Sequence, residues 1–374
     1  MNKSIFHSVL SGCLIAAFSF LLSNFLQGPS AFSWHFITLS FDPFSTLKNP
    51  IQYRFLVPLL GYLTGLKGQY YYILSLLGNV FFLIMVNYWG SKFYQSRLTA
   101  FLLAATMACL PVVLLNDSYY GWSDIFCYAL LLVALLSPRY CFWAIFLGLC
   151  AHEFFGVYIH FIFLYYYRFH RNFFEDKKKI MMMTVSLAAA LLLYGLARLW
   201  ITIHFKPEFS VGFYSGLISQ RGLFCELRGQ PLLAGFFSAY KMSSILFIPF
   251  LYFILRYRRT KILDIMVLLS ALLPAVLLFI AHDTTRFFSN TFIFILLFPK
   301  YMGKMRNGLL AFILFCNALI PTFCFDPGWR APLDKQAAWI FKKINAHERR
   351  DDAFAKIVSD FDIKALIKLC AQGS

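Results

Sequence analysis

The sequence is poor in charged residues, above all in acidic ones. Only 14% of its 374 residues are charged, with 17 Asp and Glu against 34 Lys and Arg, while 60% are hydrophobic. A single soluble core could not bury so large an apolar fraction, which excludes an ordinary soluble domain. Several runs without Asp, Glu, Lys or Arg reach the roughly 20 residues that a bilayer-spanning helix needs. The chain is therefore predicted to be an integral membrane protein, with such runs at 4–41, 68–91, 98–116, 180–197 and 307–325.

The sequence also lacks the short motifs of several enzyme classes. It has no zinc-ligand spacing, Walker loop, GxSxG or dinucleotide-binding fingerprint, and its nine cysteines are scattered without a CxxC pair. The formal net charge of +17 would suit a nucleic-acid partner, but the basic residues form short clusters beside apolar runs. That pattern is typical of the cytoplasmic ends of membrane spans, so no nucleic-acid partner is predicted.

The apolar runs predict an all-α fold, a polytopic transmembrane helical bundle of about 11 spans, within a range of about 10–12. The segment 55–66 contains Pro58 and is too short to cross, which favours a half-helix or a helix lying at the interface. The run 140–167 is either one long tilted helix or two short helices. The segment 9–26 lacks a small-x-small cleavage site and is interpreted as an uncleaved first span. The predicted spans are roughly 8–26, 69–89, 98–115, 122–137, 140–151, 153–168, 180–204, 242–256, 262–281, 286–299 and 308–324.

The distribution of charge indicates an orientation. With the N-terminus inside, 16 Lys and Arg fall at cytoplasmic positions and eight in outward loops before the tail, a positive-inside bias. One span over 140–167 would turn five basic residues at 168–179 outward, so two helices are preferred. Because ionisable groups near hydrocarbon are costly unless they line water or pair, the acids on the outer side predict one shared polar cavity at the outer face. These acids are Asp42, Asp117, Asp124, Glu153, Glu208, Glu226 and Asp283.

Two junctions between apolar segments carry candidate catalytic acids. "NDSYYGWSD" at 116–124 holds Asp117, although Ser123 or Asp124 could equally cap the next helix in a solvated loop. "AHEFFG" at 151–156 places His152 and Glu153 inside an otherwise uncharged run, where they form either a site or a structural pair.

A third junction, "HDTTR" at 282–286, repeats the His–acid pairing with His282 and Asp283. It adds Arg286, whose guanidinium suits bidentate recognition of phosphate or an ordinary pair with Asp283. Together with the pair at 152–153, these residues would supply ligands for a divalent cation, Mg²⁺ or Mn²⁺, if their helices are neighbours.

Two predicted outer loops carry further polar residues. The loop 40–58 brings Asp42 and then Arg54 immediately ahead of the half-helix, where a cation would meet a lipid phosphate or anchor the interface. The loop 205–240 carries Arg221 and Arg228 among many aromatics, a mixture that suits sugars and phosphates but also an amphipathic helix lying flat.

The layout of residues 1–325 resembles the GT-C class of polytopic membrane glycosyltransferases, with many spans and a long acid-bearing outer loop after the first span. Members typically place an essential Asp or Glu in that loop, often as an acidic pair. Asp42 matches this acid, and the second acid of the pair is missing. The resemblance implies an enzyme that moves a sugar from a polyprenyl-phosphate-linked donor to a lipid or glycan acceptor at the periplasmic face.

The resemblance also implies roles for the candidate residues. Asp42 would be the base, and an outer carboxylate would orient the acceptor hydroxyl while cations steady the departing lipid phosphate. The candidate catalytic residues are Asp42, Asp117, Glu153 and Asp283. The candidate substrate-binding and phosphate-binding residues are Arg54, His152, His282, Arg286, Arg221 and Arg228. The expected partners are membrane lipids, the lipid-linked sugar and its acceptor.

Two other functions fit the same residues. Acids and histidines at helix breaks could form the relay of a multi-span carrier, although no internal repeat is visible. A polysaccharide polymerase or ligase would share the donor chemistry and differ in its acceptor. The chain carries no eukaryotic targeting signal, which favours a bacterial inner membrane.

The composition changes after Asp326, where the chain becomes rich in charge. Residues 333–347 and 352–370 have the pattern of amphipathic helices. The sequence thus predicts a transmembrane domain over 1–325 and an amphipathic helical tail over 326–374.

Overall fold

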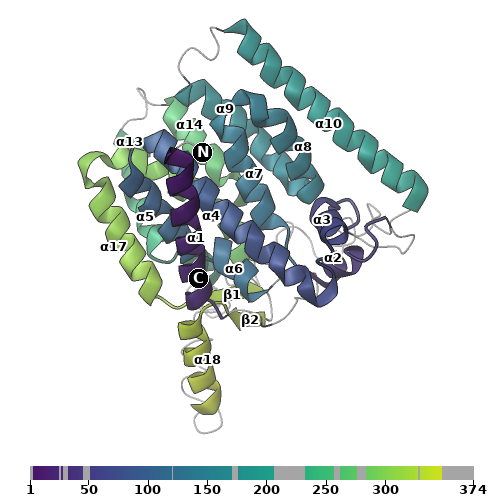
Figure 1. Ribbon diagram of the computed structural model, residues 1–374. Coiled ribbons are helices and arrows are strands. Elements are labelled where there is room, and N and C mark those ends of the chain that lie inside the picture. Colours follow the sequence, from purple (N-terminus) through teal and green to yellow (C-terminus); the bar gives the residue numbers. More distant parts are fainter. Residues whose placement is uncertain are drawn as a thin grey trace, which may run out of the picture.

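A computed structural model describes residues 3–24, 27, 33–44, 51–119, 121–170, 176–205, 232–256, 262–275, 284–326 and 329–347. The described chain is nearly all helical, as the sequence predicts (Figure 1). The α-helices are α1 (Lys3–Leu22), α2 (Ser33–Leu39), α3 (Leu56–Thr64), α4 (Tyr72–Tyr94), α5 (Arg97–Ala108), α6 (Pro111–Ser118), α7 (Asp124–Leu136), α8 (Cys141–Ala151), α9 (Ile159–Phe169), α10 (Lys177–Phe205), α12 (Leu232–Tyr240), α13 (Phe247–Arg256), α14 (Ile262–Leu272), α15 (Thr284–Ser289), α16 (Phe292–Leu297), α17 (Arg306–Leu319) and α18 (Lys335–His347). Short 3-10 helices are η1 (Gly68–Tyr71), η2 (Pro138–Tyr140), η3 (Glu153–Tyr158), η4 (Lys241–Leu246) and η6 (Phe298–Met305).

Four described helices are long and apolar enough to cross a membrane: Ile5–Leu22, Gly68–Tyr94, Lys177–Phe205 and Leu233–Ile254. A fifth arises if α5 and α6, which meet at a bend of 46°, count as one span. Shorter apolar helices, including α7 and α8, lie among them. An integral membrane protein with a helical architecture is therefore supported, and the figure of about 11 crossings stays a prediction.

Helix α4 runs through the middle of the bundle and packs against α1, α5 and α7 (Figure 1). The contact with α1 is close because Gly12 has no side chain, and a Cβ there would lie 2.5 Å from Ile84. Helix α10 lies along one edge and packs on α8, with most of its apolar side chains exposed. Outward apolar surface of this kind is what a lipid-facing helix presents.

The run 140–167 forms two helices that fold back on each other, as preferred from the charge distribution. Tyr166 near the end of α9 donates to the Ala134 carbonyl at 2.6 Å, and the thiol of Cys141 at the start of α8 contacts the same oxygen at 3.7 Å. The turn between α8 and α9 is tight because the Phe155 ring packs directly on Gly148. The predicted short helix at 55–66 is also present, as α3, and ends at Gly65 in the left-handed region with φ of 76°.

The two ends of the bundle differ in charge. At one end Lys300 lies 4.3 Å from the ring centroids of both Phe93 and Phe169, which brings the ends of α4 and α9 together. We call this the basic end, because it gathers Lys92, Arg97, Arg139, Arg168, Lys300, Lys304 and Arg306. At the opposite end Ser19 of α1 donates to Asp117 of α6 at 3.0 Å, and the acids Asp117, Asp124 and Glu153 all lie there.

That opposite end also carries an antiparallel hairpin that the sequence did not predict. Strands β1 (Phe323–Asp326) and β2 (Trp329–Pro332) pair with Phe323 opposite Pro332. The backbone N–H of Phe325 donates to Thr285 at 2.9 Å, and Ser118 donates to the Leu333 carbonyl at 2.8 Å, so the hairpin binds α15 and α6. We call this the hairpin end. Helix α18 follows and matches the amphipathic helix predicted over 333–347, whereas the one predicted over 352–370 lies outside the described residues.

Candidate functional site

Five ionisable residues from four separate parts of the chain meet at the hairpin end. They are Arg54, Asp124, His152, Glu153 and Arg286, and together we call them the charged cluster. Arg54 precedes α3, Asp124 begins α7, the His–Glu pair joins α8 to α9, and Arg286 lies on α15. All are largely buried, with Glu153 the most open at 30% side-chain exposure.

Arg54 and Glu153 form a bidentate pair. The Nε of Arg54 donates to Glu153 Oε2 at 2.8 Å, and its Nη2 donates to Oε1 at 2.6 Å. Both carboxylate oxygens of Glu153 accept hydrogen bonds from the positively charged guanidinium, which stabilises the ionised form of the carboxyl group. Glu153 is therefore an ionised carboxylate with one side open to solvent.

Arg286 and Asp124 form the second bidentate pair. The Nη2 of Arg286 donates to Asp124 Oδ1 at 2.9 Å, and its Nε donates to Oδ2. Asp124 is the first residue of α7, where the partial positive charge of a helix N-terminus stabilises a carboxylate. The guanidinium also lies over the Trp122 ring, 3.7 Å from its centroid, so an aromatic face and a carboxylate fix its plane together.

His152 lies between the two pairs. Its Nε2 is 3.8 Å from Asp124 Oδ1, and its Nδ1 is 3.6 Å from Glu153 Oε2. Nδ1 accepts the backbone N–H of Phe154 at 3.1 Å, which assigns the ring proton to Nε2 in the neutral form. Burial, with the charge of Arg54, lowers the pKa of His152 to about 4. The imidazole is therefore neutral near pH 7 and lies between the two carboxylates without adding charge.

A hydrogen-bonded layer supports the charged cluster from beneath. Tyr128 of α7 donates to the Asn290 side chain, and Tyr158 of η3 donates to the Asn290 carbonyl at 2.6 Å. The backbone N–H of Asn290 in turn donates to the Arg286 carbonyl at 3.1 Å. These contacts hold α15 against α7 and the turn after α8, and thereby keep Arg286 beside Asp124.

The charged cluster is electrically balanced. Two guanidinium groups face two carboxylates, and the neutral His152 adds nothing, so the formal charges cancel. Removing one partner of such a buried pair strongly destabilises a protein, because the other charge is left buried without a partner. An incoming anion such as phosphate would compete with a carboxylate for the same guanidinium face, because both match its fork geometry.

The structure leaves two of the predicted catalytic acids out of this cluster. Asp117 is buried and accepts hydrogen bonds from Asn79 at 2.7 Å and Ser19 at 3.0 Å, which ties α6 to α4 and α1. Asp42 is exposed and accepts the backbone N–H of Phe44 at 3.3 Å in a local turn. The remaining predicted residues lie outside the described residues: Asp283, His282, Arg221 and Arg228.

The proposed divalent-cation site rests partly on residues that the structure does not describe. Within the described ranges, no group of three or more His, Cys, Asp or Glu side chains is placed to hold a metal ion. His152 and Glu153 instead contact Arg54 and Asp124. The half of the predicted ligand set at 282–283 has no described position.

Two residues of the site were not among the candidate site residues predicted from the sequence, although Asp124 was one of the acids expected around the outer cavity. Asp124 was interpreted as a possible helix cap, and it is the partner of Arg286. Trp122 was one aromatic among several in its loop, and it forms the platform for the same guanidinium. The available signal was the position of Asp124 immediately before an apolar run, where burial demands a partner.

Comparisons with protein-family models, curated proteins and solved structures find no match to this chain.

Proposed function

We propose that the protein is a membrane glycosyltransferase that moves a sugar from a polyprenyl-phosphate-linked donor to a lipid or glycan acceptor. The observation that carries the proposal is the convergence of Arg54, Asp124, His152, Glu153 and Arg286 from four junctions at one end of the bundle. Glycosyl transfer from such a donor needs a cation for the departing phosphate and a carboxylate for the acceptor hydroxyl. The charged cluster contains both groups.

The two parts of Arg54–Glu153 then have different roles. A donor phosphate takes the bidentate face of Arg54 that Glu153 occupies in the structure. The carboxylate, released from its guanidinium, becomes a stronger base and orients the acceptor hydroxyl. Arg286 and Asp124, anchored by Trp122, hold the opposite side of the site in place.

The topology that goes with this function has about 11 crossings and a polar cavity at the outer face. The basic end is cytoplasmic by the positive-inside rule, so the hairpin end faces outward. In the sequence, Asp283 and His282 come one and two positions before the start of α15, and Asp42 belongs to the predicted first outer loop. The proposed cavity would include Glu153, whose side chain is 30% exposed.

The test uses purified protein in proteoliposomes, supplied with lipid-linked sugars extracted from the source cells after metabolic radiolabelling. We expect labelled sugar to leave the polyprenyl-phosphate fraction with the unsubstituted chain, and the rate to fall at least about a hundredfold with Glu153→Gln. The matched control is Asp264→Asn, because Asp264 forms a comparable pair with Arg168, at 3.1 Å, at the basic end. Equal activity of the two variants, or no transfer by the unsubstituted chain, would contradict the proposal.

A carrier is the second candidate, favoured by the fact that both guanidinium groups are already paired across different helices. Such pairs can act as gates that open and close together with the helices they join. Counterflow of radiolabelled sugar in the same proteoliposomes, without loss of label from the lipid-linked fraction, would establish the carrier and reject the transferase. A polymerase or ligase would instead lengthen an added glycan acceptor.

A further inference from the structure

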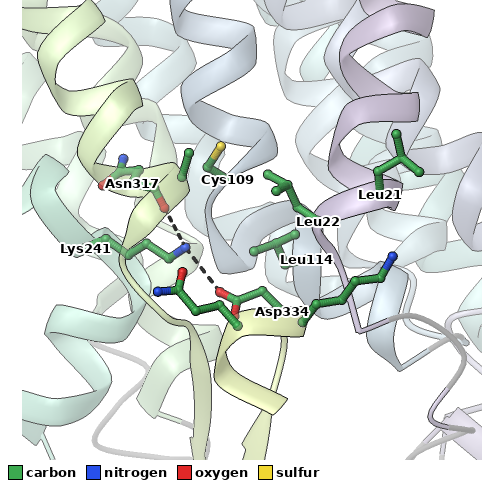
Figure 2. Close-up of a pocket in the computed structure, with 10 residues that line it drawn as sticks. Leu21, Leu22, Cys109, Leu114, Lys241, Asn317 and Asp334 are labelled. Atoms are coloured by element: carbon green, nitrogen blue, oxygen red, sulfur yellow. Dashed lines mark hydrogen bonds and ion pairs between the residues drawn. The ribbon is translucent and has the colours of Figure 1, made fainter. Parts of the chain in front are cut away.

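A second polar site lies at the hairpin end, outside the charged cluster. It is a cavity of about 230 Å³ between α1, α6, α17 and the start of α18 (Figure 2). One water molecule takes up about 30 Å³ in the liquid, so the cavity has room for a group several times larger. Lys241, Asn317 and Asp334 form its polar wall, and Leu21, Leu22 and Leu114 form its apolar wall.

The polar wall is built around a buried ammonium group. The side chain of Lys241 is only 2% exposed, and its Nζ donates to the Asn317 carbonyl at 3.0 Å and lies 3.5 Å from Asp334 Oδ2. An ammonium group has three donors, so these two partners leave one for a ligand. Lys241 also adopts a positive φ of 46°, which is uncommon for a side chain of this size and sets its direction at the junction of α12 and η4.

The charge of this wall favours an anion. The Asp334 carboxylate is shared, because its Oδ1 also accepts the backbone N–H of Ala337 at 2.5 Å and caps α18. Lys335 lines the same cavity and is exposed. Lys241 and Lys335 line the cavity together with one carboxylate, Asp334, so the lining has a formal excess of one positive charge.

The apolar wall opens toward the lipid-facing surface. Leu21 and Leu22 are the last residues of α1, one of the candidate membrane spans, so the cavity lies at the level where that span ends. Exposed apolar side chains run along α1 and α17 up to the cavity: Leu10, Leu14, Phe18 and Leu21 on one helix, and Phe312, Phe315 and Leu319 on the other. A ligand here would meet a cation at one end and a hydrocarbon surface along its length.

We propose that this cavity binds the phosphate headgroup of an anionic membrane phospholipid, with Lys241 and Lys335 as the cationic contacts and the acyl chains along α1 and α17. A phosphate oxygen accepts from the remaining donor of Lys241, and the position at the end of a span matches the depth of lipid headgroups. This inference does not depend on the proposed function, because no residue of the charged cluster lines the cavity.

The test measures lipid binding to the full chain in neutral detergent, with phosphatidylglycerol and phosphatidylcholine compared by native mass spectrometry. We expect the unsubstituted chain to retain phosphatidylglycerol preferentially, and Lys241→Met to weaken that retention about fivefold or more. Ala318→Phe fills the cavity without removing the ion pair, and it should have the same effect if Lys241→Met fails to fold. Lys304→Gln, an exposed lysine at the basic end, is the matched control and should change nothing.

A competition experiment distinguishes a site for a phospholipid headgroup from a site for free inorganic phosphate. Inorganic phosphate at the same concentration should not displace the lipid, because it gains nothing from the apolar wall. Displacement by inorganic phosphate would mean a site for a free anion and would overturn the proposal. So would equal retention of the two lipids, or undiminished retention of phosphatidylglycerol by Ala318→Phe.

Discussion

Arg286 and Asp124 are 162 positions apart in the sequence, and the guanidinium of Arg286 donates two hydrogen bonds to the carboxylate of Asp124. The contact joins α15 to the first residue of α7 at a point where both side chains are nearly buried, 11% and 6% exposed. It therefore binds the early and late parts of the chain to each other. We therefore expect the free energy of this pair to contribute to the stability of the hairpin end.

A double-mutant cycle measures that free energy. Asp124→Asn and Arg286→Gln each leave a buried charge without its partner, so each should lower stability by about 3–5 kcal/mol. The double variant should lose less than the sum, because the second change removes the orphaned charge. Thermal unfolding in detergent gives the three values. Lys179→Met, which breaks an exposed pair with Asp176, should leave the thermal midpoint nearly unchanged. Strict additivity in the cycle would mean that the two groups do not interact.

The pH dependence of stability should report His152. Burial lowers the pKa of His152 to about 4, against roughly 6.5 for an unperturbed histidine. Between these two pKa values His152 is protonated in the unfolded chain and neutral in the folded chain. The neutral His152 therefore contributes its full stability above about pH 6.5, and this contribution is lost as the pH falls toward about 4. His152→Gln should therefore show a shallower decline of the thermal midpoint over that window. An unchanged decline would place the pKa of His152 near its ordinary value.

The tight turn between α8 and α9 should not accept a side chain at Gly148. A Cβ there would lie 2.3 Å from the Phe155 ring, so Gly148→Ala must displace a buried ring and should cost about 1–3 kcal/mol. Gly195 in the middle of α10 has no neighbouring atom within 4 Å of the corresponding position, and Gly195→Ala should raise stability by about 0.5–1 kcal/mol. The measurement is the thermal midpoint of each variant, compared with that of the unsubstituted chain in the same detergent. A neutral Gly148→Ala would show that the turn relaxes.

Labelling with a membrane-impermeant maleimide should separate the two ends of the bundle. Asp42→Cys and Tyr70→Cys lie at exposed positions of the hairpin end, and Arg139→Cys and Lys304→Cys lie at exposed positions of the basic end. In intact cells the first pair should react and the second should react only after permeabilisation, each measured against the unsubstituted chain. Reaction of one member of each pair from the same side would overturn the proposed topology.

Most of the helices could be predicted from the sequence because apolar runs long enough to be buried leave few alternatives, but α12 lies in the predicted outer loop 205–240. The fold-back at 152–158 was also predictable, since only two helices keep the basic residues at 168–179 on the side of the other basic clusters. The hairpin was missed because Phe323 to Asp326 are apolar enough to continue the preceding span. Nothing local in that segment signals a strand pairing with Trp329 to Pro332.

Four of the five members of the charged cluster were predicted from the sequence as site residues, but their pairing was not. His152, Glu153 and Arg286 stood out because charge between apolar segments is costly, and Arg54 because it is a cation immediately ahead of the half-helix. Which carboxylate each arginine meets depends on which junctions become neighbours, and that follows from helix packing across 99 and 162 positions. Asp124 was therefore interpreted through its local surroundings as a helix cap. It does begin α7, and it carries the long-range contact as well.

The hydrogen bond from Phe325 to Thr285 has a consequence for the order of assembly during synthesis. Thr285 is adjacent to Arg286, and the strand that secures it is among the last described parts of the chain to leave the ribosome. The helices that precede α15 can enter the bilayer and pack before Arg286, the partner of Asp124, has been synthesised. A chain truncated before the hairpin would keep the acids and Arg286 but would lack the strand that hydrogen-bonds Thr285 beside it.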